Sequence, residues 1–155
     1  MPTDNDAMSD MPRGLLEVSR AEALRLLGTV PYGRVVFTLR ALPAIRPVNH
    51  IVDRGDIVIR TGYGAALAGA AGEGVVVAYE ADEIDPEHQS GWSVIVTGLT
   101  QMVTNDEDVE RYRRLLRPWV GGAKDAVIRI RPAFVTGNRL VAAGFQDQPA
   151  GRPET

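Results

Sequence analysis

The chain has 155 residues, of which 45% are hydrophobic and 24% are charged, and its formal net charge is −3 at pH 7. This length and composition predict one globular domain, and the negative charge argues against a nucleic-acid binder, which neutralises phosphates with basic side chains. Cysteine is absent, which excludes disulfides, thiolate metal sites and thiol nucleophiles, and without an apolar run of ~20 residues or a signal-peptide pattern we expect a cytoplasmic protein with no membrane partner.

The two ends of the sequence differ from its middle. Residues 1–14 and 146–155 are polar and rich in proline, glycine or glutamine, which predicts a disordered N-terminal tail and a flexible C-terminal tail around a domain at 15–145. Near the start of that domain, Ser19 and Glu22 make a capping-box pattern. The helix that they begin should end at Gly28.

Three strands with unusually polar residues follow between residues 33 and 61. Residues 33–39 and 56–61 alternate between apolar and polar side chains, which is typical of a strand with one buried face. The run at 44–52 lies between them and has arginine, asparagine, histidine and proline at strand positions. Residues 53–56 form the tight turn that follows it. We therefore expect an anionic or planar ligand beside these strands.

The second half of the chain continues the β pattern. The Ala/Gly-rich residues 62–74 can form only a short helix, and a second helix is expected at 106–117, with Asn105 as its cap. Strands are predicted at 75–80, 92–103, 126–131 and 134–141, and Gly98 should mark a bend or bulge in the second of them. The sequence therefore predicts a mainly β fold with minor α: a six- to seven-stranded antiparallel barrel with two or three flanking helices.

Three groups of residues are candidates for a site. The Gly62–Gly69 segment has the spacing GxGxxxxG and is too short for a dinucleotide-binding βαβ unit, so it is either a helix start that presents N–H groups to a phosphate or a flexible turn. The second group is formed by Arg46, Asn49, His50, Arg60 and Thr61, whose donors suit phosphate oxygens, although each arginine alone could equally face solvent.

The third group is Trp92 with Ser93 at the start of a strand. The indole ring could stack on a flat heteroaromatic ligand, or it could pack in the core. The two histidines, His50 and His88, lack partners at metal-ligand spacing, so we expect no metal site. No side chain stands out as a catalytic acid, base or nucleophile, so the catalytic residues remain unknown.

Five segments of the sequence are characteristic when taken together: YGRVVF at 32–37, IRPVNH at 45–50, IRTG at 59–62, VAYEAD at 77–82 and GWSVIVTG at 91–98. In this order they resemble the pyridoxamine 5′-phosphate oxidase-like flavin-binding family. The resemblance is strongest to its actinobacterial branch, with nitroimidazole-reductase-like proteins as relatives. The resemblance covers residues 18–141, and the RPVN and GWSV blocks are its most specific parts.

This resemblance implies a split β-barrel that forms a homodimer with FMN in the groove between protomers. It implies that residues 46–49 line the isoalloxazine ring, that Arg60 and Thr61 meet the ribityl phosphate, and that residues 92–93 approach the ring from either protomer. The full set of cofactor-binding residues expected is Arg46, Pro47, Val48, Asn49, His50, Arg60, Thr61, Gly62, Ala66, Leu67, Trp92 and Ser93.

One position departs from the family pattern. Family members often carry a lysine before the leucine that follows the third of these strands, and here Ala66 precedes Leu67. Loss of a charge-assisted contact to phosphate costs about 1.5–3 kcal/mol. The resemblance nevertheless implies a flavin-dependent oxidoreductase that acts on a small molecule, in which the cofactor carries the redox chemistry. The alternatives are a deazaflavin-dependent reductase and a non-catalytic flavin- or haem-binding protein, in which His50 would be an axial ligand.

Overall fold

The computed structural model describes residues 14–117 and 125–141, so the predicted tails lie outside the described residues except for Gly14. These two stretches contain seven strands and three helices. They are β1 (Leu15–Val18), α1 (Arg20–Leu27), β2 (Tyr32–Leu39), β3 (Leu42–Asp53), β4 (Asp56–Thr61), α2 (Gly64–Ala68), β5 (Val76–Asp85), β6 (Ser90–Met102), α3 (Asp106–Leu115) and β7 (Ala126–Leu140).

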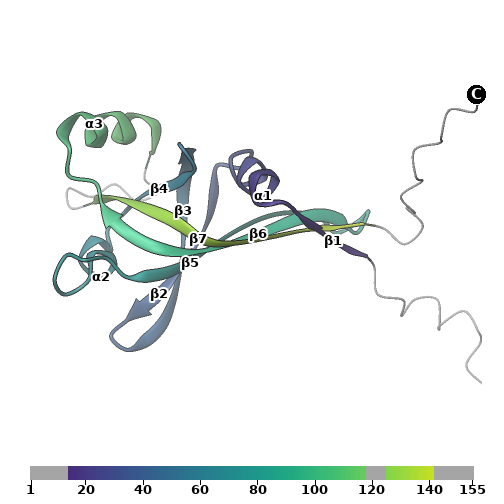
Figure 1. Cartoon of the computed structure of the whole chain (residues 1–155), viewed down its shortest axis with the longest axis horizontal. Helices are drawn as coiled ribbons and strands as arrows, with labels where there is room; N and C mark the ends of the chain where they lie inside the picture. The colour runs from purple at the N-terminus through teal and green to yellow at the C-terminus, as the bar shows by residue number, and fades with distance from the viewer. Residues whose placement is uncertain (1–13, 118–124, 142–155) are drawn as a thin grey trace, which may run out of the picture.

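The strands close into a barrel. Their order is β1-β7-β4-β3-β2-β5-β6, all neighbours are antiparallel, and β6 pairs again with β7, so six strands form the barrel and β1 lies outside it. Figure 1 shows the long β6–β7 ribbon with β1 at one end and α2 and α3 at the other. The predicted mainly β antiparallel barrel is confirmed.

Two strands differ from the sequence-based expectation. β1 was not predicted, because its four residues acquire strand character by pairing with the far end of β7. β7 is one strand of 15 residues, not two, because Pro132 is accommodated in a bulge. At this bulge Thr97 pairs with Phe134 while Gly98 pairs with Pro132. A proline without an N–H group is tolerated at such a bulge, so the strand continues through it.

Gly98 lies at the bulge, as its position in the sequence predicts. A Cβ atom at Gly98 would collide with the carbonyl oxygen of Arg131 on the neighbouring strand. The two backbones approach closely here, and only glycine leaves room for that approach.

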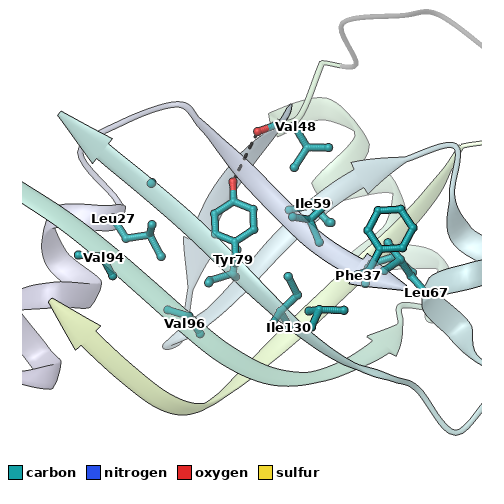
Figure 2. Close-up of a cluster of buried hydrophobic side chains, with 14 of the residues drawn as sticks. Leu27, Phe37, Val48, Ile59, Leu67, Tyr79, Val94, Val96 and Ile130 are labelled. Carbon is teal, nitrogen blue, oxygen red and sulfur yellow. Dashed lines mark hydrogen bonds between the residues drawn. The ribbon is translucent and has the colours of Figure 1, made fainter. Parts of the chain in front are cut away.

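The inward-facing side chains of all six barrel strands form one hydrophobic core. Its largest fully buried members include Tyr79, Ile57, Ile59 and Ile130. Figure 2 shows Tyr79 in this core with its hydroxyl directed towards the carbonyl oxygen of Val48, 3.5 Å away. The barrel interior is thus filled by side chains and leaves the ligand site to its outside or its ends.

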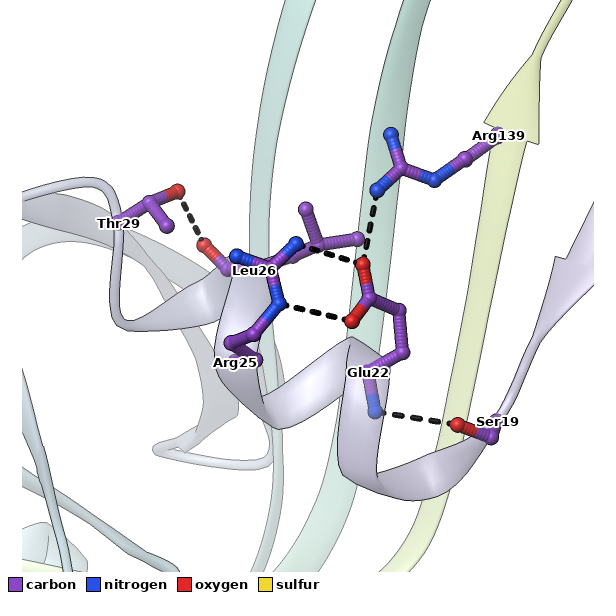
Figure 3. Close-up of polar contacts among 6 residues, drawn as sticks. All are labelled: Ser19, Glu22, Arg25, Leu26, Thr29 and Arg139. Atoms are coloured by element: carbon purple, nitrogen blue, oxygen red, sulfur yellow. Dashed lines mark hydrogen bonds and ion pairs between the residues drawn. The ribbon is translucent and has the colours of Figure 1, made fainter.

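Helix α1 begins at the predicted cap and is tied to the sheet. Ser19 Oγ accepts a hydrogen bond from the Glu22 N–H at 3.1 Å, as Figure 3 shows. The Glu22 carboxylate accepts from Arg25 of the same helix and from Arg139 of β7. These two guanidinium groups lower the pKa of Glu22 to about 2. In the described part of the chain, each helix is too short or too polar to cross a membrane.

Candidate functional site

The polar residues of β3 and β4 are divided between the two faces of the sheet. Arg46 lies on the inner face of β3, on which Val48 and His50 are also found. Arg60 lies on the outer face of β4 with Val58, since side chains alternate along a strand. Val58 packs against residues at α3, not in the barrel core. The two arginines therefore do not converge on one point.

Arg60 is occupied by contacts within the fold. Its Nη1 donates to the carbonyl oxygens of Leu116 at 3.0 Å and Arg113 at 3.3 Å, at the C-terminal end of α3. Its Nε forms an ion pair with Oδ2 of Asp125, whose side chain is only 7% exposed. A cation at this helix end satisfies carbonyl groups that have no partner within the helix. A phosphate contact at Arg60, which the family resemblance implies, would first have to displace Asp125.

Asn49 also holds the end of α3. Its Nδ2 donates to the carbonyl oxygen of Arg117 at 2.6 Å. Between this contact and the turn after α1 lies a cleft of about 610 Å³, whose lining includes Thr29, Asn49 and Arg117. Asn49 therefore lies at a cleft, on the α3 side of the sheet and away from Arg46.

His50 is buried and both its ring nitrogens have partners. Nε2 lies 2.7 Å from the carbonyl oxygen of Leu27, which can only accept, so Nε2 carries the proton. Nδ1 then accepts the hydroxyl proton of Tyr79, at a very short distance. Burial lowers the pKa of His50, which favours this neutral tautomer. An axial bond from His50 to a haem iron would break one of these two contacts, so the structure gives His50 a role inside the barrel.

Arg46 makes contacts of another kind. Its Nε donates to the Tyr63 hydroxyl at 3.0 Å, and its guanidinium carbon lies 5.0 Å from the centre of the Tyr63 ring. Its Nη1 donates to the carbonyl oxygen of Ile45 at 2.8 Å. Within residues 14–117 and 125–141, no carboxylate forms an ion pair with Arg46. Its positive charge is thus available to an anion.

The backbone beside Arg46 has an open side. Pairing of β3 with β4 begins at His50 and Ile59, so the preceding part of β3 has only β2 as a neighbour. The His50 N–H points to the β2 side, where it bonds to Pro31. Because the backbone N–H and C=O groups of successive strand residues point to alternate sides, the backbone polar groups of Ile45 and Pro47 point to the open side. Proline has no N–H, so this edge presents mainly carbonyl oxygens and resists pairing with another strand.

Thr61 and Tyr63 connect this edge to α2. Thr61 is buried, and its Oγ1 accepts a hydrogen bond from the Tyr63 N–H at 3.1 Å. The Tyr63 ring lies 5.6 Å from that of Phe37. Tyr63 was not among the predicted site residues, although an aromatic residue inside a glycine-rich segment was a signal that could have identified it. We call Arg46, Thr61 and Tyr63 the Arg46 corner.

The remaining candidates are spread around α2 and β6. Gly62 is exposed, Leu67 is fully buried in the core, and Ala66 packs against that core. Trp92 is 5% exposed and belongs to the core, which is the packing alternative left open by the sequence. Ser93 lies on the opposite face of β6.

Trp92 and Arg60 are separated by the length of the β6–β7 ribbon. Arg60 of β4 pairs with Val127 of β7. The next residue of β7 pairs with Met102 of β6, and Met102 lies ten positions after Trp92 on that strand. At about 3.3 Å per residue, this places them roughly 33 Å apart along the strands. One protomer alone therefore does not bring Trp92 to Arg60.

Comparison with known proteins agrees with this barrel. The family described as pyridoxamine 5′-phosphate oxidase matches residues 19–139. An uncharacterised protein of Mycobacterium tuberculosis H37Rv is 52% identical over 145 residues, which cover 91% of this chain and 95% of the relative.

Two solved structures are also similar. One is described as a pyridoxamine 5′-phosphate oxidase of Corynebacterium glutamicum, with a TM-score of 0.70 and 33% sequence identity. The match covers 83% of this chain and 100% of that protein's chain. The other is the FAD-binding protein of Mycobacterium smegmatis, with a TM-score of 0.66 and 32% sequence identity. The match covers 82% of this chain and 99% of that protein's chain.

Proposed function

Because the chain belongs to the pyridoxamine 5′-phosphate oxidase-like family, a family of flavin-binding split barrels, we propose that it binds a flavin at the Arg46 corner and acts as an oxidoreductase on a small molecule. The sequence resemblance implies FMN as the flavin. The similarity to an FAD-binding protein of Mycobacterium smegmatis adds FAD as a second form of the same cofactor.

The observation that carries this proposal is the unneutralised guanidinium of Arg46. Its partners are a hydroxyl and a carbonyl oxygen, both of which are neutral. A planar guanidinium forms short, charge-assisted bonds to phosphate oxygens. Arg46 therefore fits the phosphate of a flavin, and it can supply the positive charge that Ala66 does not.

The other groups of the Arg46 corner suit the remainder of such a ligand. Tyr63 offers a partly exposed aromatic ring, and the open edge of β3 offers backbone carbonyl oxygens. Thr61 holds Tyr63 in place through the bond to its N–H. These residues would bind and orient the flavin, while the flavin itself would supply hydride or electron transfer.

Arg60 is assigned a different role in this proposal. Its ion pair with Asp125 and its bonds to the end of α3 leave it no free charge for a phosphate. We therefore expect Arg46, not Arg60, to control flavin affinity. The homodimer with flavin at the protomer interface and the cytoplasmic location stay predictions of the sequence.

The test is a titration of the purified protein with FMN and FAD, followed by flavin fluorescence and calorimetry. Loss of one charge-assisted phosphate contact costs about 1.5–3 kcal/mol, so Arg46→Ala should raise the dissociation constant roughly 10- to 150-fold. Arg114→Ala removes an exposed arginine of α3 and serves as the matched control, with no change expected. A wild-type protein that binds neither flavin, or an Arg46→Ala variant with unchanged affinity, would refute the proposal.

A deazaflavin is the second candidate cofactor, since the alanine at position 66 leaves room for either cofactor. Without a lysine at that position, the ring contacts and Arg46 must provide most of the selectivity between cofactors. The same titration with a deazaflavin decides between them. Haemin in a further titration tests the non-catalytic haem alternative, for which the internal contacts of His50 are unfavourable.

A further inference from the structure

The guanidinium of Arg46 keeps most of its hydrogen-bond donors for a ligand. Its Nε donates to the Tyr63 hydroxyl at 3.0 Å, and its Nη1 donates to the carbonyl oxygen of Ile45 at 2.8 Å. A guanidinium carries five N–H donors in one plane, so the second Nη1–H and both Nη2–H groups remain without a partner among the described residues. Donors at this end of the side chain can bond two oxygens of one phosphate in parallel.

Tyr63 holds Arg46 in this orientation. Its hydroxyl accepts the Nε–H group, and its ring centre lies 5.0 Å from the guanidinium carbon. Tyr63 is itself fixed by two contacts, since Thr61 Oγ1 accepts its N–H at 3.1 Å and the Phe37 ring lies 5.6 Å away. A flexible arginine loses side-chain entropy when it binds a ligand, and this support removes part of that loss before binding. Tyr63 is therefore a positioning residue for Arg46.

The Tyr63 hydroxyl adds a donor of its own. Because it accepts from Arg46, its O–H proton is left for another acceptor. The next backbone position of β3, Pro47, lies on the open side of the strand, where it has no N–H and presents a carbonyl oxygen. A phosphate at this place thus meets donors from Arg46 and Tyr63 and an acceptor from Pro47.

The Arg46 corner carries a single positive charge. Arg46 is the only charged residue from Leu42 to Val48 of β3, and the five residues of α2 include none. Arg60 on the neighbouring strand is already neutralised by Asp125. One positive charge matches a phosphate that carries one negative charge.

The phosphates of flavin cofactors differ in this respect. A phosphate monoester such as FMN has a second pKa near 6, so it carries about −1.5 to −2 charges at pH 7 and three acceptor oxygens. A phosphodiester has one charge and two such oxygens, and each phosphate of FAD is of this kind. The cost of taking an ion out of water rises with the square of its charge, whereas its attraction to one guanidinium rises only in proportion to it. A single arginine therefore suits the diester better.

We propose that Arg46, oriented by Tyr63, forms a site for a singly charged phosphodiester and so selects FAD, or another diester of the cofactor, over FMN. This inference rests on the proposed flavin binding and specifies the form of the cofactor, which differs from the FMN that the family resemblance implies. The ring system, flavin or deazaflavin, does not enter the choice, because Arg46 meets the phosphate.

The test compares three ligands that differ only at the phosphate: riboflavin, FMN and riboflavin 5′-(methyl phosphate), a diester without adenine. In calorimetric titrations of the wild type at about pH 7.5, the methyl ester should bind roughly tenfold more tightly than FMN or riboflavin, and FAD should resemble the ester. Equal or tighter binding of FMN would overturn this inference alone. A protein that binds none of the four ligands refutes the proposed function, and the inference falls with it.

The positioning role of Tyr63 has a test that packing alone would not pass. Tyr63→Phe keeps the ring and removes the hydroxyl, so it should weaken binding of the methyl ester about tenfold and leave riboflavin unchanged. Tyr32→Phe alters another partly exposed tyrosine and is the matched control, with no change expected for either ligand. Equal losses for the ester and riboflavin would contradict the assigned role.

A second cation should reverse the preference. Ala66→Lys adds one on α2 and should tighten FMN binding about tenfold more than binding of the methyl ester, whereas Ala66→Gln, without the charge, should change neither. Gly62→Lys serves the same purpose if Ala66→Lys destabilises the fold, because Gly62 is exposed and an added Cβ has no atom within 4 Å. A lysine that improves both ligands equally would show that charge does not govern the selection.

Discussion

Replacing Arg60 by alanine should lower the stability of the fold more than it lowers flavin affinity. The substitution removes the ion pair with Asp125 and two hydrogen bonds to carbonyl oxygens at the end of α3. Asp125 would be left with Arg113, whose nearest nitrogen lies 3.6 Å from its other oxygen. The loss would therefore fall on the attachment of α3 to the barrel.

The magnitude follows from the burial of this pair. The side chain of Arg60 is 18% exposed and that of Asp125 is 7% exposed. Removing one partner of a buried pair costs about 3–5 kcal/mol, and the remaining contact with Arg113 places our expectation near 3 kcal/mol. Since a domain is stabilised by only about 5–15 kcal/mol in total, this is a large fraction of it. In a chain of this length it corresponds to a fall in Tm of roughly 6–12 °C.

Urea unfolding followed by circular dichroism measures this loss, and flavin titration of the same variant measures affinity. Asp125→Asn should destabilise the fold in the same direction. In a double-mutant cycle of Arg60→Ala with Asp125→Asn, the two losses should not add, because both substitutions break one contact. A stability change below about 1 kcal/mol together with a tenfold weaker flavin affinity would return Arg60 to the phosphate site and refute the reasoning.

Two further predictions concern pH and backbone packing. Because burial lowers the pKa of His50, the unfolded chain takes up this proton first, so the free energy of unfolding should fall as pH drops below the unfolded pKa of about 6.5. Glu80, whose pKa is raised to about 7, acts in the opposite direction between pH 7 and 4.5. In urea titrations from pH 8 to 5, His50→Asn should remove the first trend and Glu80→Gln the second; unchanged slopes would disprove the assignments. Gly98→Ala should cost about 1–3 kcal/mol because its Cβ meets the Arg131 carbonyl, whereas Gly62→Ala, with no atom within 4 Å, should be neutral in the same assay.

Much of the barrel could be predicted because strand patterning is local. The alternation at 33–39 and 56–61 predicted β2 and β4 to within one residue. The continuous β7 could not be predicted, because Pro132 is a strand breaker unless the partner strand offers a bulge, and the partner is distant in sequence. β1 has the same explanation: four residues are too few to show a period, and only pairing with β7 makes them a strand.

The candidate site could be predicted only in its residue types. Arg46 and Asn49 are three positions apart, so strand alternation already places them on opposite faces of β3. The sequence does not reveal which face a helix covers, and α3 covers the one that carries Asn49 and Arg60. Trp92 illustrates a second limit, because an indole that packs in the core and one that stacks on a ligand have the same local sequence.

The proposed flavin site depends on the separation of Arg46 from Arg60, because Ala66 supplies no positive charge there. A buried arginine that pairs with a carboxylate contributes to folding, and its charge is cancelled where it lies. An arginine that bonds only to neutral oxygens keeps its charge for a ligand at little cost, because it remains partly hydrated. Substitution at Arg46 should therefore change affinity at constant stability, and substitution at Arg60 should do the reverse. Coupling between the two effects would mean that the two faces of β3 and β4 act as one site, in which a bound phosphate competes with Asp125 for Arg60.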